Sequence, residues 1–332
     1  LHMKKLLALM IAAIIAVAAA GCGRMSDVKL VDKDKSSFTV AVLQVNTHTA
    51  LDAARNGFKD RLNEWASDNG KTIIFDENNA LGKSASETSM ADKIVAAQPD
   101  IMLGISTSSA RALAGSTTKI PLLYTAVTAP DGSGISGKNV TGTSDMAPIA
   151  RQIDLVKTVS PDCRKIALVY HASEENSEKQ IKIAEERCAA IGLATKKYAI
   201  PDVNSITTTA SEIRNAGDID AVYVPTDNML ASNIAAFCDE LYGDKNSTAK
   251  IPVIAGEDGL CEDGEALATP GISYYELGVQ TAEMAIKLLC GESPENIAWE
   301  YYDRECNVFV NETNAKKLGF TDEKIAEIKN FA

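Results

Sequence analysis

The sequence is poor in aromatic and imidazole side chains. Aromatic residues make up 5% of its 332 residues, and there are only three histidines, His2, His48 and His171. So few and so scattered histidines predict no metal site. The sequence also lacks a phosphate-binding G-x-x-x-x-G-K-[ST] loop, a G-x-G-x-x-G between a strand and a helix, and a G-x-S-x-G elbow. We therefore expect no catalytic residues and no cofactor, and an enzyme is the weaker class.

The sequence also lacks an excess of positive charge. Its 33 Lys and Arg are outnumbered by 45 Asp and Glu, which gives a net charge of −12. Nucleic-acid phosphates need a basic face, so we expect no nucleic-acid partner. Beyond the first two dozen residues, no apolar run is long enough to cross a membrane.

The cysteines lack the spacing of a metal or redox motif. Beyond Cys22 there are six, none of them in a C-x-x-C pair: Cys163, Cys188, Cys238, Cys261, Cys290 and Cys306. A chain with about 310 residues after Cys22 does not need disulfides to be stable. We expect many of the six to be buried free thiols, although an extracellular location would permit disulfides and the spacing cannot choose among pairings.

What the sequence does have is the pattern of a lipoprotein signal at residues 1–22. Met3-Lys4-Lys5 precedes an uncharged stretch from Leu6 to Ala20, and Gly21 leads into Cys22. This stretch of about 15 residues is too short to span the roughly 30 Å of a bilayer core as a helix. We expect cleavage before Cys22, lipidation of Cys22, and a protein anchored to the cell membrane on its extracytoplasmic side. The removed segment carries two lysines and no acid, so the net charge falls by two, from −12 to −14.

Residues 23–37 are polar and without periodicity, which predicts a flexible linker before a fold beginning at Phe38. From there, short apolar runs alternate with helical patterns. Strands are expected at 39–43, 72–75, 101–105, 121–126, 165–170 and 197–200, and helices at 50–66, 84–97, from 108, and at 177–191. Such alternation is typical of parallel sheets covered by helices on both faces, an α/β fold.

Two stretches of the chain resemble each other, which favours two similar lobes. Residues 100–107 (DIMLGIST) resemble 220–227 (DAVYVPTD), and 119–123 (KIPLL) resemble 250–254 (KIPVI). Tandem α/β lobes suggest duplication. In open α/β sheets ligands lie beyond the carboxyl ends of the strands, so two facing lobes would enclose a ligand in a hinged cleft.

Candidate site residues follow the predicted strands. They are mostly neutral or acidic, without a basic cluster, which makes a phosphate a poor ligand. They are Gln44, Asn46, Thr107, Ser108, Thr125, Thr128, Glu174, Asn176, Ser177, Asp227, Asn228, Glu257 and Asp258.

Two of these positions predict opposite halves of an amino acid. Asn176 and Ser177 begin a helix whose free N–H groups could hold a carboxylate. Asp227 could pair with an ammonium group. Simpler roles stay open, because Ser177 with Gln180 fits a capping box and Asp227 fits a helix N-cap.

These residues belong to longer motifs that resemble one family. The motifs are VLQ at 42–44, LDAARNGF at 51–58, TAV at 125–127, NVTGTSD at 139–145, EENS at 174–177, VPTDN at 224–228 and YYELG at 274–278. In this order, over about residues 38–297, they resemble the tryptophan/tyrosine-binding substrate-binding lipoproteins of ABC importers.

The resemblance implies a type I periplasmic-binding-protein fold with three chain crossings between lobes. It implies a monomeric lipoprotein that serves an ABC permease and an ATPase by delivering an aromatic amino acid. By position, Asn176 and Ser177 would bind the ligand carboxylate and Asp227 the amine, while Gln44 and Thr107 would close the cleft. Tyr124 and Tyr274 are the best aromatic candidates for the cleft, or else Tyr274 is a hinge residue.

The predicted first lobe covers residues 38–146 plus 275–291, and the second covers 147–274 plus 292–332. Two alternatives remain open. A binding protein for a sugar or nucleoside would need stacking aromatics and many neutral hydrogen-bonding groups. A tethered sensor would hand its signal to a receptor rather than to a permease.

Overall fold

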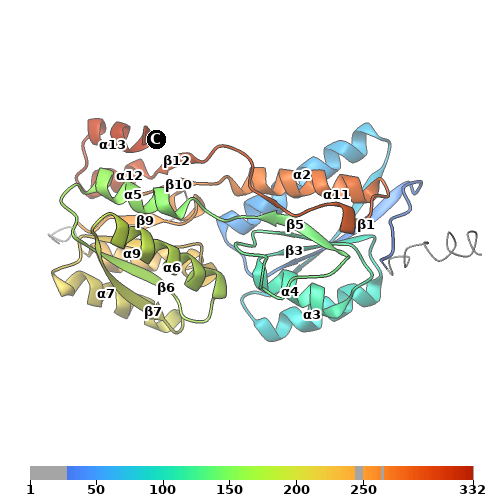
Figure 1. The fold of residues 1–332 in the computed structure, drawn as a ribbon, viewed down its shortest axis with the longest axis horizontal. Helices are drawn as coiled ribbons and strands as arrows, with labels where there is room; N and C mark the ends of the chain where they lie inside the picture. Colours follow the sequence, from blue (N-terminus) through green and yellow to red (C-terminus); the bar gives the residue numbers. More distant parts are fainter. Residues whose placement is uncertain (1–27, 244–249, 263–264, 332) are drawn as a thin grey trace, which may run out of the picture.

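Two lobes, each built on a six-stranded sheet, lie side by side in a computed structural model of the chain (Figure 1). It describes residues 28–243, 250–262 and 265–331, so the predicted signal and Cys22 lie outside the described residues. The predicted fold class, two α/β lobes on mainly parallel sheets, is confirmed.

The first sheet has the order β11-β5-β4-β3-β1-β2, and all of its strand pairs are parallel. Its chain order is β1 (Ser37–Gln44), α2 (Thr49–Asp68), β2 (Thr72–Asn79), α3 (Ser84–Ala97), β3 (Ile101–Ile105), α4 (Thr107–Ser116), β4 (Leu122–Thr125) and β5 (Val140–Ser144).

The second sheet has the order β12-β10-β9-β8-β6-β7, and only β12 runs antiparallel to its neighbour. Its elements are α5 (Ile149–Val159), β6 (Lys165–His171), α6 (Glu175–Ala190), β7 (Ala194–Ile200), η1 (Val203–Ser205), α7 (Ile206–Ala216), β8 (Ala221–Val224), α8 (Asn228–Ala231), α9 (Ile234–Tyr242), β9 (Val253–Ala255), α10 (Gly259–Glu262) and β10 (Ala268–Gly271).

The last part of the chain visits both lobes. Its elements are α11 (Tyr274–Leu289), η2 (Pro294–Asn296), β11 (Glu300–Tyr301), β12 (Asn307–Val310), α12 (Glu312–Lys317) and α13 (Asp322–Lys329). The chain passes between lobes at residues 145–148, 272–273 and 302–306, which are the three expected crossings.

One lobe boundary differs from the prediction. Residues 292–332 were all expected in the second lobe, but Glu300 and Tyr301 pair with Thr143 and Ser144 on β5 of the first sheet. The prediction is therefore wrong for β11, because this edge of the first sheet takes its last strand from after α11. The return to the second lobe comes only at residues 302–306.

The two lobes share one topology. In both sheets, five parallel strands have the same order and connectivity, and β3 occupies the position in the first sheet that β8 occupies in the second. These are the strands within the similar segments 100–107 and 220–227, and the other similar pair leads into β4 and β9. The sequence similarity therefore marks structurally equivalent strands.

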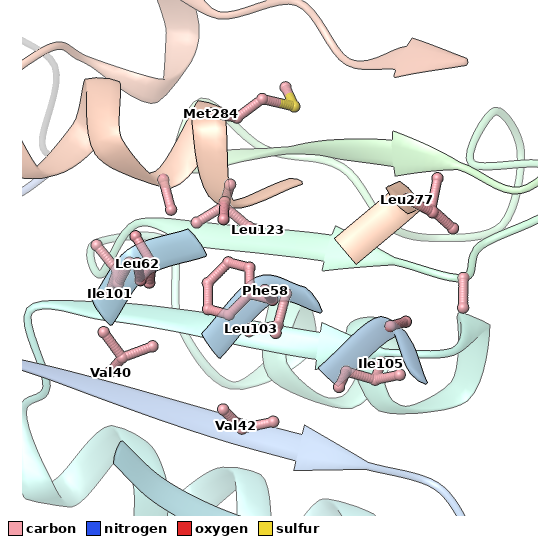
Figure 2. Packing of buried hydrophobic residues seen from close by; sticks show 14 of the residues in the cluster. Val40, Val42, Phe58, Leu62, Ile101, Leu103, Ile105, Leu123, Leu277 and Met284 are labelled. Carbon is pink, nitrogen blue, oxygen red and sulfur yellow. The ribbon is translucent and has the colours of Figure 1, made fainter. Parts of the chain in front are cut away.

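Alternating side chains of β1 explain why the first sheet is covered on both faces. Val40 and Val42 point to one face, into the cluster formed with α2 and α11, and Figure 2 shows side chains of both helices gathered over those of the strands. Ala41 and Leu43 point to the opposite face, into the cluster formed with α3 and α4. Because both faces of a parallel sheet are buried, its strands are nearly all apolar.

Helices α2 and α11 cross at two glycines. A Cβ on Gly57 would lie 2.0 Å from the Tyr275 carbonyl oxygen, and a Cβ on Gly278 would lie 2.0 Å from the Ala54 carbonyl oxygen. Real Cβ atoms do not approach an oxygen this closely, so no larger residue fits at either position without separating the helices. The glycines thereby fix how near α11 lies to α2.

The predicted flexible linker is not free in its described part, residues 28–36. Val28 and Val31 are buried, and Val31 joins the core beneath α2 and α11. The Lys29 amide donates to the Lys119 carbonyl over 2.8 Å, and Lys35 Nζ lies 2.5 Å from Asp100 Oδ1. The two valines supply the apolar area that a true linker lacks, so this part of the prediction is wrong.

All six cysteines after Cys22 lie among the described residues, none of them is in a disulfide there, and four are buried. Among the described residues, no helix combines the length and apolar character needed to cross a bilayer.

Candidate functional site

A cleft between the lobes holds two neighbouring cavities at the carboxyl ends of the strands. The outer cavity has a volume of about 550 Å³. It takes Val45, Leu81 and Thr107 from the first lobe, and His171 and Met229 from the second. A volume of this size is typical of small-molecule sites.

The inner cavity lies nearer the crossings and is far smaller. Its volume of about 10 Å³ admits a single group of about the size of a water molecule. Thr107, Asn176 and Asn228 line both cavities, so the two share a wall.

Three carboxyl groups line the inner cavity. Asp145 follows β5, Asp227 follows β8 and Glu257 follows β9, and all three are buried. Glu257 Oε1 and Asp145 Oδ1 have no hydrogen-bond partner. No lysine, arginine or histidine lines this cavity, so its described walls offer no counter-charge to the three carboxyls.

Burial governs how these acids ionise. It raises the pKa of Asp145, against the opposing effect of the hydrogen bond from Tyr274 Oη to Asp145 Oδ2 at 2.7 Å. It raises the pKa of Asp227 to about 7, with a further contribution from the Glu174 carboxylate. It raises the pKa of Glu257 well above the ordinary range, and the charges of Asp258 and Asp145 act in the same direction. A positive group entering the inner cavity would favour their ionised forms.

Glu174 is held differently, because its carboxylate is fully bonded. Burial acts to raise its pKa, but hydrogen bonds from His171 Nδ1, from the amides of Asn228 and Met229, and from Asn228 Nδ2 keep the pKa below its usual value. Glu174 therefore ties the start of α6 to the start of α8 as a structural carboxylate.

The amino end of α4 points into the cleft. The first N–H groups of a helix have no partner within it, and the first intrahelical bond here runs from the Ala110 amide to the Ser106 carbonyl. Ser106, just before α4, has φ +94°, and two further residues with positive φ, Leu81 and Ala126, line the outer and inner cavities. Backbone strain of this kind concentrates where a binding site fixes the chain.

The two lobes touch directly across the cleft, so the structure is closed. Asn46 Nδ2 donates to Ser232 Oγ over 2.9 Å. His48 Nε2 lies 3.2 Å from Asn228 Oδ1. Arg111 bridges the opening to Glu175, with 2.7 Å between its guanidinium and the carboxylate.

The structure brings most of the predicted site residues to the cavities. Asn46, Ser108 and Glu174 line the outer cavity, Asp227 and Tyr274 line the inner one, and Thr107, Asn176 and Asn228 line both. They come from both lobes, and Tyr274 begins α11 immediately after a crossing.

Four predicted site residues are not at either cavity. The Gln44 side chain turns back toward α2, where its amide contacts Asp52 and Arg55. Thr125 is buried, and its hydroxyl accepts from Thr143 within the first lobe. Ser177 donates to the Thr226 carbonyl. Asp258 accepts from the amide of the next residue and lines neither cavity.

The two simpler roles left open by the sequence have opposite outcomes. The capping box at Ser177 is wrong, because α6 begins two residues earlier and no side chain caps it. The N-cap role of Asp227 is confirmed, since its Oδ1 accepts from the Leu230 amide over 3.0 Å. Its Oδ2 also accepts from the His171 amide, which leaves Asp227 less available than Glu257.

The sequence analysis assigned no role to two carboxyls of the cleft that each have an oxygen without a hydrogen-bond partner. Glu257 was only one of several residues after a strand, and Asp145 ended a family motif. The sequence did carry a signal for both residues, since each is an acidic residue just after the carboxyl end of a strand, where the cleft lies. Arg111 was missed because it lies within a helix, one turn beyond Thr107.

One group of possible metal ligands also lies here. Ligand atoms of His171, Glu174 and Asp227 lie within 4.8 Å of one another. Each already serves the hydrogen-bond network described above, so we assign no metal to them.

Three comparisons place the chain among known proteins. The family model for ABC transporter substrate-binding proteins matches residues 39–328. A tyrosine-binding protein of Clostridioides difficile is 33% identical over 95% of this chain and 92% of its own length.

Two solved structures extend the comparison. A domain from Streptococcus pneumoniae in complex with L-Trp has a TM-score of 0.78 at 28% identity, covering 88% of this chain and 98% of its own. A ligand-free, open substrate-binding protein with adhesive properties from Clostridium difficile has a TM-score of 0.66 at 34% identity, covering 86% and 96%. The present structure superposes better on the L-Trp complex than on the open, ligand-free protein, although its sequence identity to the complex is lower. This agrees with a closed cleft, in which the two lobes contact each other. Sugar and polyol binders at 12% to 17% identity share the fold alone.

Proposed function

Because the chain belongs to the family of ABC transporter substrate-binding proteins, we propose that it captures an α-amino acid with an aromatic side chain between its lobes. The family consists of binding proteins, and the prediction that the chain is not an enzyme is confirmed. In the proposed complex, the ligand head group lies at the inner cavity and its side chain in the outer cavity.

The inner cavity carries the proposal. It has room for one small group and is walled by three carboxyls without a positive side chain among its described lining residues. An ammonium group is about the size of a water molecule and supplies the missing charge. Charge-assisted hydrogen bonds to buried carboxylates are strong, and a sugar hydroxyl would leave the carboxyls uncompensated.

The ligand carboxylate is proposed to lie at the amino end of α4, beside Thr107. The free N–H groups there favour an anion, and Thr107 lines both cavities. The amino end of α6, expected from the sequence to hold the carboxylate, carries Glu174 and Glu175, which would repel it. Asn176 stays in the proposed site as a neighbour of both cavities.

The outer cavity suits an apolar side chain with a polar edge. Val45, Leu81, Val203 and Met229 offer apolar surface, and His171 offers a polar partner. The tyrosine-binding relative and the complex with L-Trp support an aromatic side chain.

We further propose that the protein works outside the cytoplasm, anchored through a lipid on Cys22. The signal pattern of residues 1–22 supports this. Its partners would be the permease and the ATPase of an importer, which receive the ligand from the closed form.

A thermal-shift experiment tests the proposed ligand. L-Tryptophan and L-tyrosine should raise the melting temperature of the purified protein, because a ligand bound only by the folded state stabilises it by about 2.7 kcal/mol at 100 times its Kd. N-acetyl-L-tryptophan, which has no ammonium group, should not. A rise only with sugars or nucleosides would contradict the proposal.

A further inference from the structure

Glu257 is the most isolated carboxyl of the cleft. It follows β9, it is 2% exposed, and its Oε1 has no hydrogen-bond partner. The nearest side-chain nitrogen that could carry a charge is His48 Nδ1, at 3.9 Å across the lobes. The protonation of Glu257 and His48 therefore determines whether the closed, ligand-free cleft buries an unpaired negative charge.

The hydrogen bonds around His48 fix its tautomer. Asn228 Nδ2 donates to Glu174 Oε2 over 2.8 Å, so the amide oxygen Oδ1 faces His48 Nε2. Nε2 must then carry the ring hydrogen, and burial lowers the pKa of His48, which keeps the ring neutral. Its Nδ1 therefore presents a lone pair toward Glu257 Oε1, and neither atom has a hydrogen-bond partner. A carboxylate in this position would face a second acceptor without a donor between them, whereas a protonated carboxyl would point a donor toward a lone pair 3.9 Å away.

The groups around Glu257 give it no positive charge. They come from every element that packs against it: Asp145 after β5, Glu174 after β6, Asp227 after β8, the adjacent Asp258, Tyr274 on α11 and the neutral His48 before α2. Burial and these negative neighbours raise the pKa of Glu257 well above its ordinary range.

We propose that Glu257 carries a proton in the closed, ligand-free cleft and releases it to solvent when a ligand ammonium group enters the inner cavity. The carboxyl O–H bond breaks, the proton leaves to water, and the carboxylate pairs with the ammonium group. Glu257 is thereby a specificity-determining residue, and ligand uptake is coupled to the loss of one proton. This inference rests on the proposed function.

Calorimetry measures the proton directly. Titration of L-tryptophan at pH 7 in phosphate and in Tris separates the heat of binding from the heat of buffer protonation. The wild-type protein should release one proton or more per ligand. Glu257→Gln, which resembles the protonated carboxyl in shape, should release about one proton fewer, because Asp145 and Asp227 line the same cavity and can still ionise, and should bind at least tenfold more weakly.

The pH dependence of affinity gives a second readout. Since binding releases a proton, Kd should fall as the pH rises above the ordinary range of a glutamate pKa, by up to tenfold per unit, and should fall less steeply in Glu257→Gln. Asp100→Asn alters a buried acid at the far end of β3 and should keep the proton release. No release in the wild type, or unchanged release in Glu257→Gln, would overturn the inference.

Unfolding of the ligand-free protein tests the protonation of Glu257 independently of whether the protein binds an amino acid. If Glu257 is protonated in the folded state, the ratio of the wild-type unfolding constant to that of Glu257→Gln should rise about tenfold per pH unit between pH 5 and 7. A flat ratio would refute the protonated Glu257 even if the amino acid binds. A rising ratio without amino-acid binding would refute the proposed function instead.

Discussion

Replacing Gly278 by alanine should destabilise the first lobe. The added Cβ would lie 2.0 Å from the Ala54 carbonyl oxygen and 2.9 Å from the Phe58 amide nitrogen. Both are backbone atoms of α2, so the helices must separate by more than about 1 Å to restore an ordinary contact. Overpacking of this severity costs about 3 kcal/mol, and the better helix propensity of alanine returns about 1 kcal/mol. The expected net loss is about 2 kcal/mol.

Urea unfolding followed by tryptophan fluorescence suits this test. The chain has two tryptophans, and both report on the first lobe. Trp65 lies on α2 with its ring centroid 6.1 Å from that of Phe38, and Trp299 lies 4.9 Å from Tyr301 on β11. Far-UV circular dichroism reports on both lobes. If the second lobe unfolds in a separate transition, the urea midpoint of that transition should be the same in Gly278→Ala as in the wild type, because the substitution lies in the first lobe.

The matched control is Gly115→Ala on α4. A Cβ there meets no atom within 4 Å, so only helix propensity changes, and the free energy of unfolding should rise by about 0.5 to 1 kcal/mol. Opposite signs at the two glycines are the expected result. A Gly278→Ala protein as stable as the wild type would refute the claim that these glycines set the helix spacing.

Three smaller tests follow from the contacts of the cleft and the core. Tyr274→Phe deletes the hydrogen bond to Asp145 and should lower the free energy of unfolding by about 1 to 2 kcal/mol in urea titrations; an unchanged midpoint would show that the bond is not formed. Asn46→Ala removes the bond to Ser232 across the cleft, so small-angle scattering should give a larger radius of gyration without ligand but not at saturation. Because none of the described cysteines is in a disulfide, a reducing agent should leave the melting temperature unchanged, and a drop would reveal a disulfide.

Hydrophobic periodicity predicted ten elements in their observed order, but β5, α5 and most of the elements after β7 were not assigned. The predicted helix at 84–97 and strand at 101–105 have the bounds of α3 and β3. Strand ends were less certain, since β2 continues for four residues beyond the predicted 72–75. The extra residues, Asp76 to Asn79, are polar because β2 is an edge strand, and an apolar criterion ends too early there.

The site was harder to predict, because a strand end gives the place of a residue but not its direction. Gln44 and Thr125 follow the rule for strand ends, yet their side chains bond within the first lobe. Ser177 faces a carbonyl from a neighbouring strand end. Glu257 was among the candidates after the predicted strands but was given no role, because only the folded structure shows that its Oε1 is buried without a hydrogen-bond partner.

The attachment of residues 28–36 to the first lobe determines which half of the molecule moves. With Cys22 held by lipid as proposed, residues 22–27 can span at most about 20 Å, so the first lobe stays close to the bilayer. The second lobe is joined to the first by the three crossings and by contacts across the cleft, such as those of Asn46 with Ser232 and of Arg111 with Glu175, which must break before it can swing. Under the proposed anchoring, the first lobe would be the half held near the membrane, and a permease would meet that half in a nearly constant place while ligand-dependent movement occurs in the other.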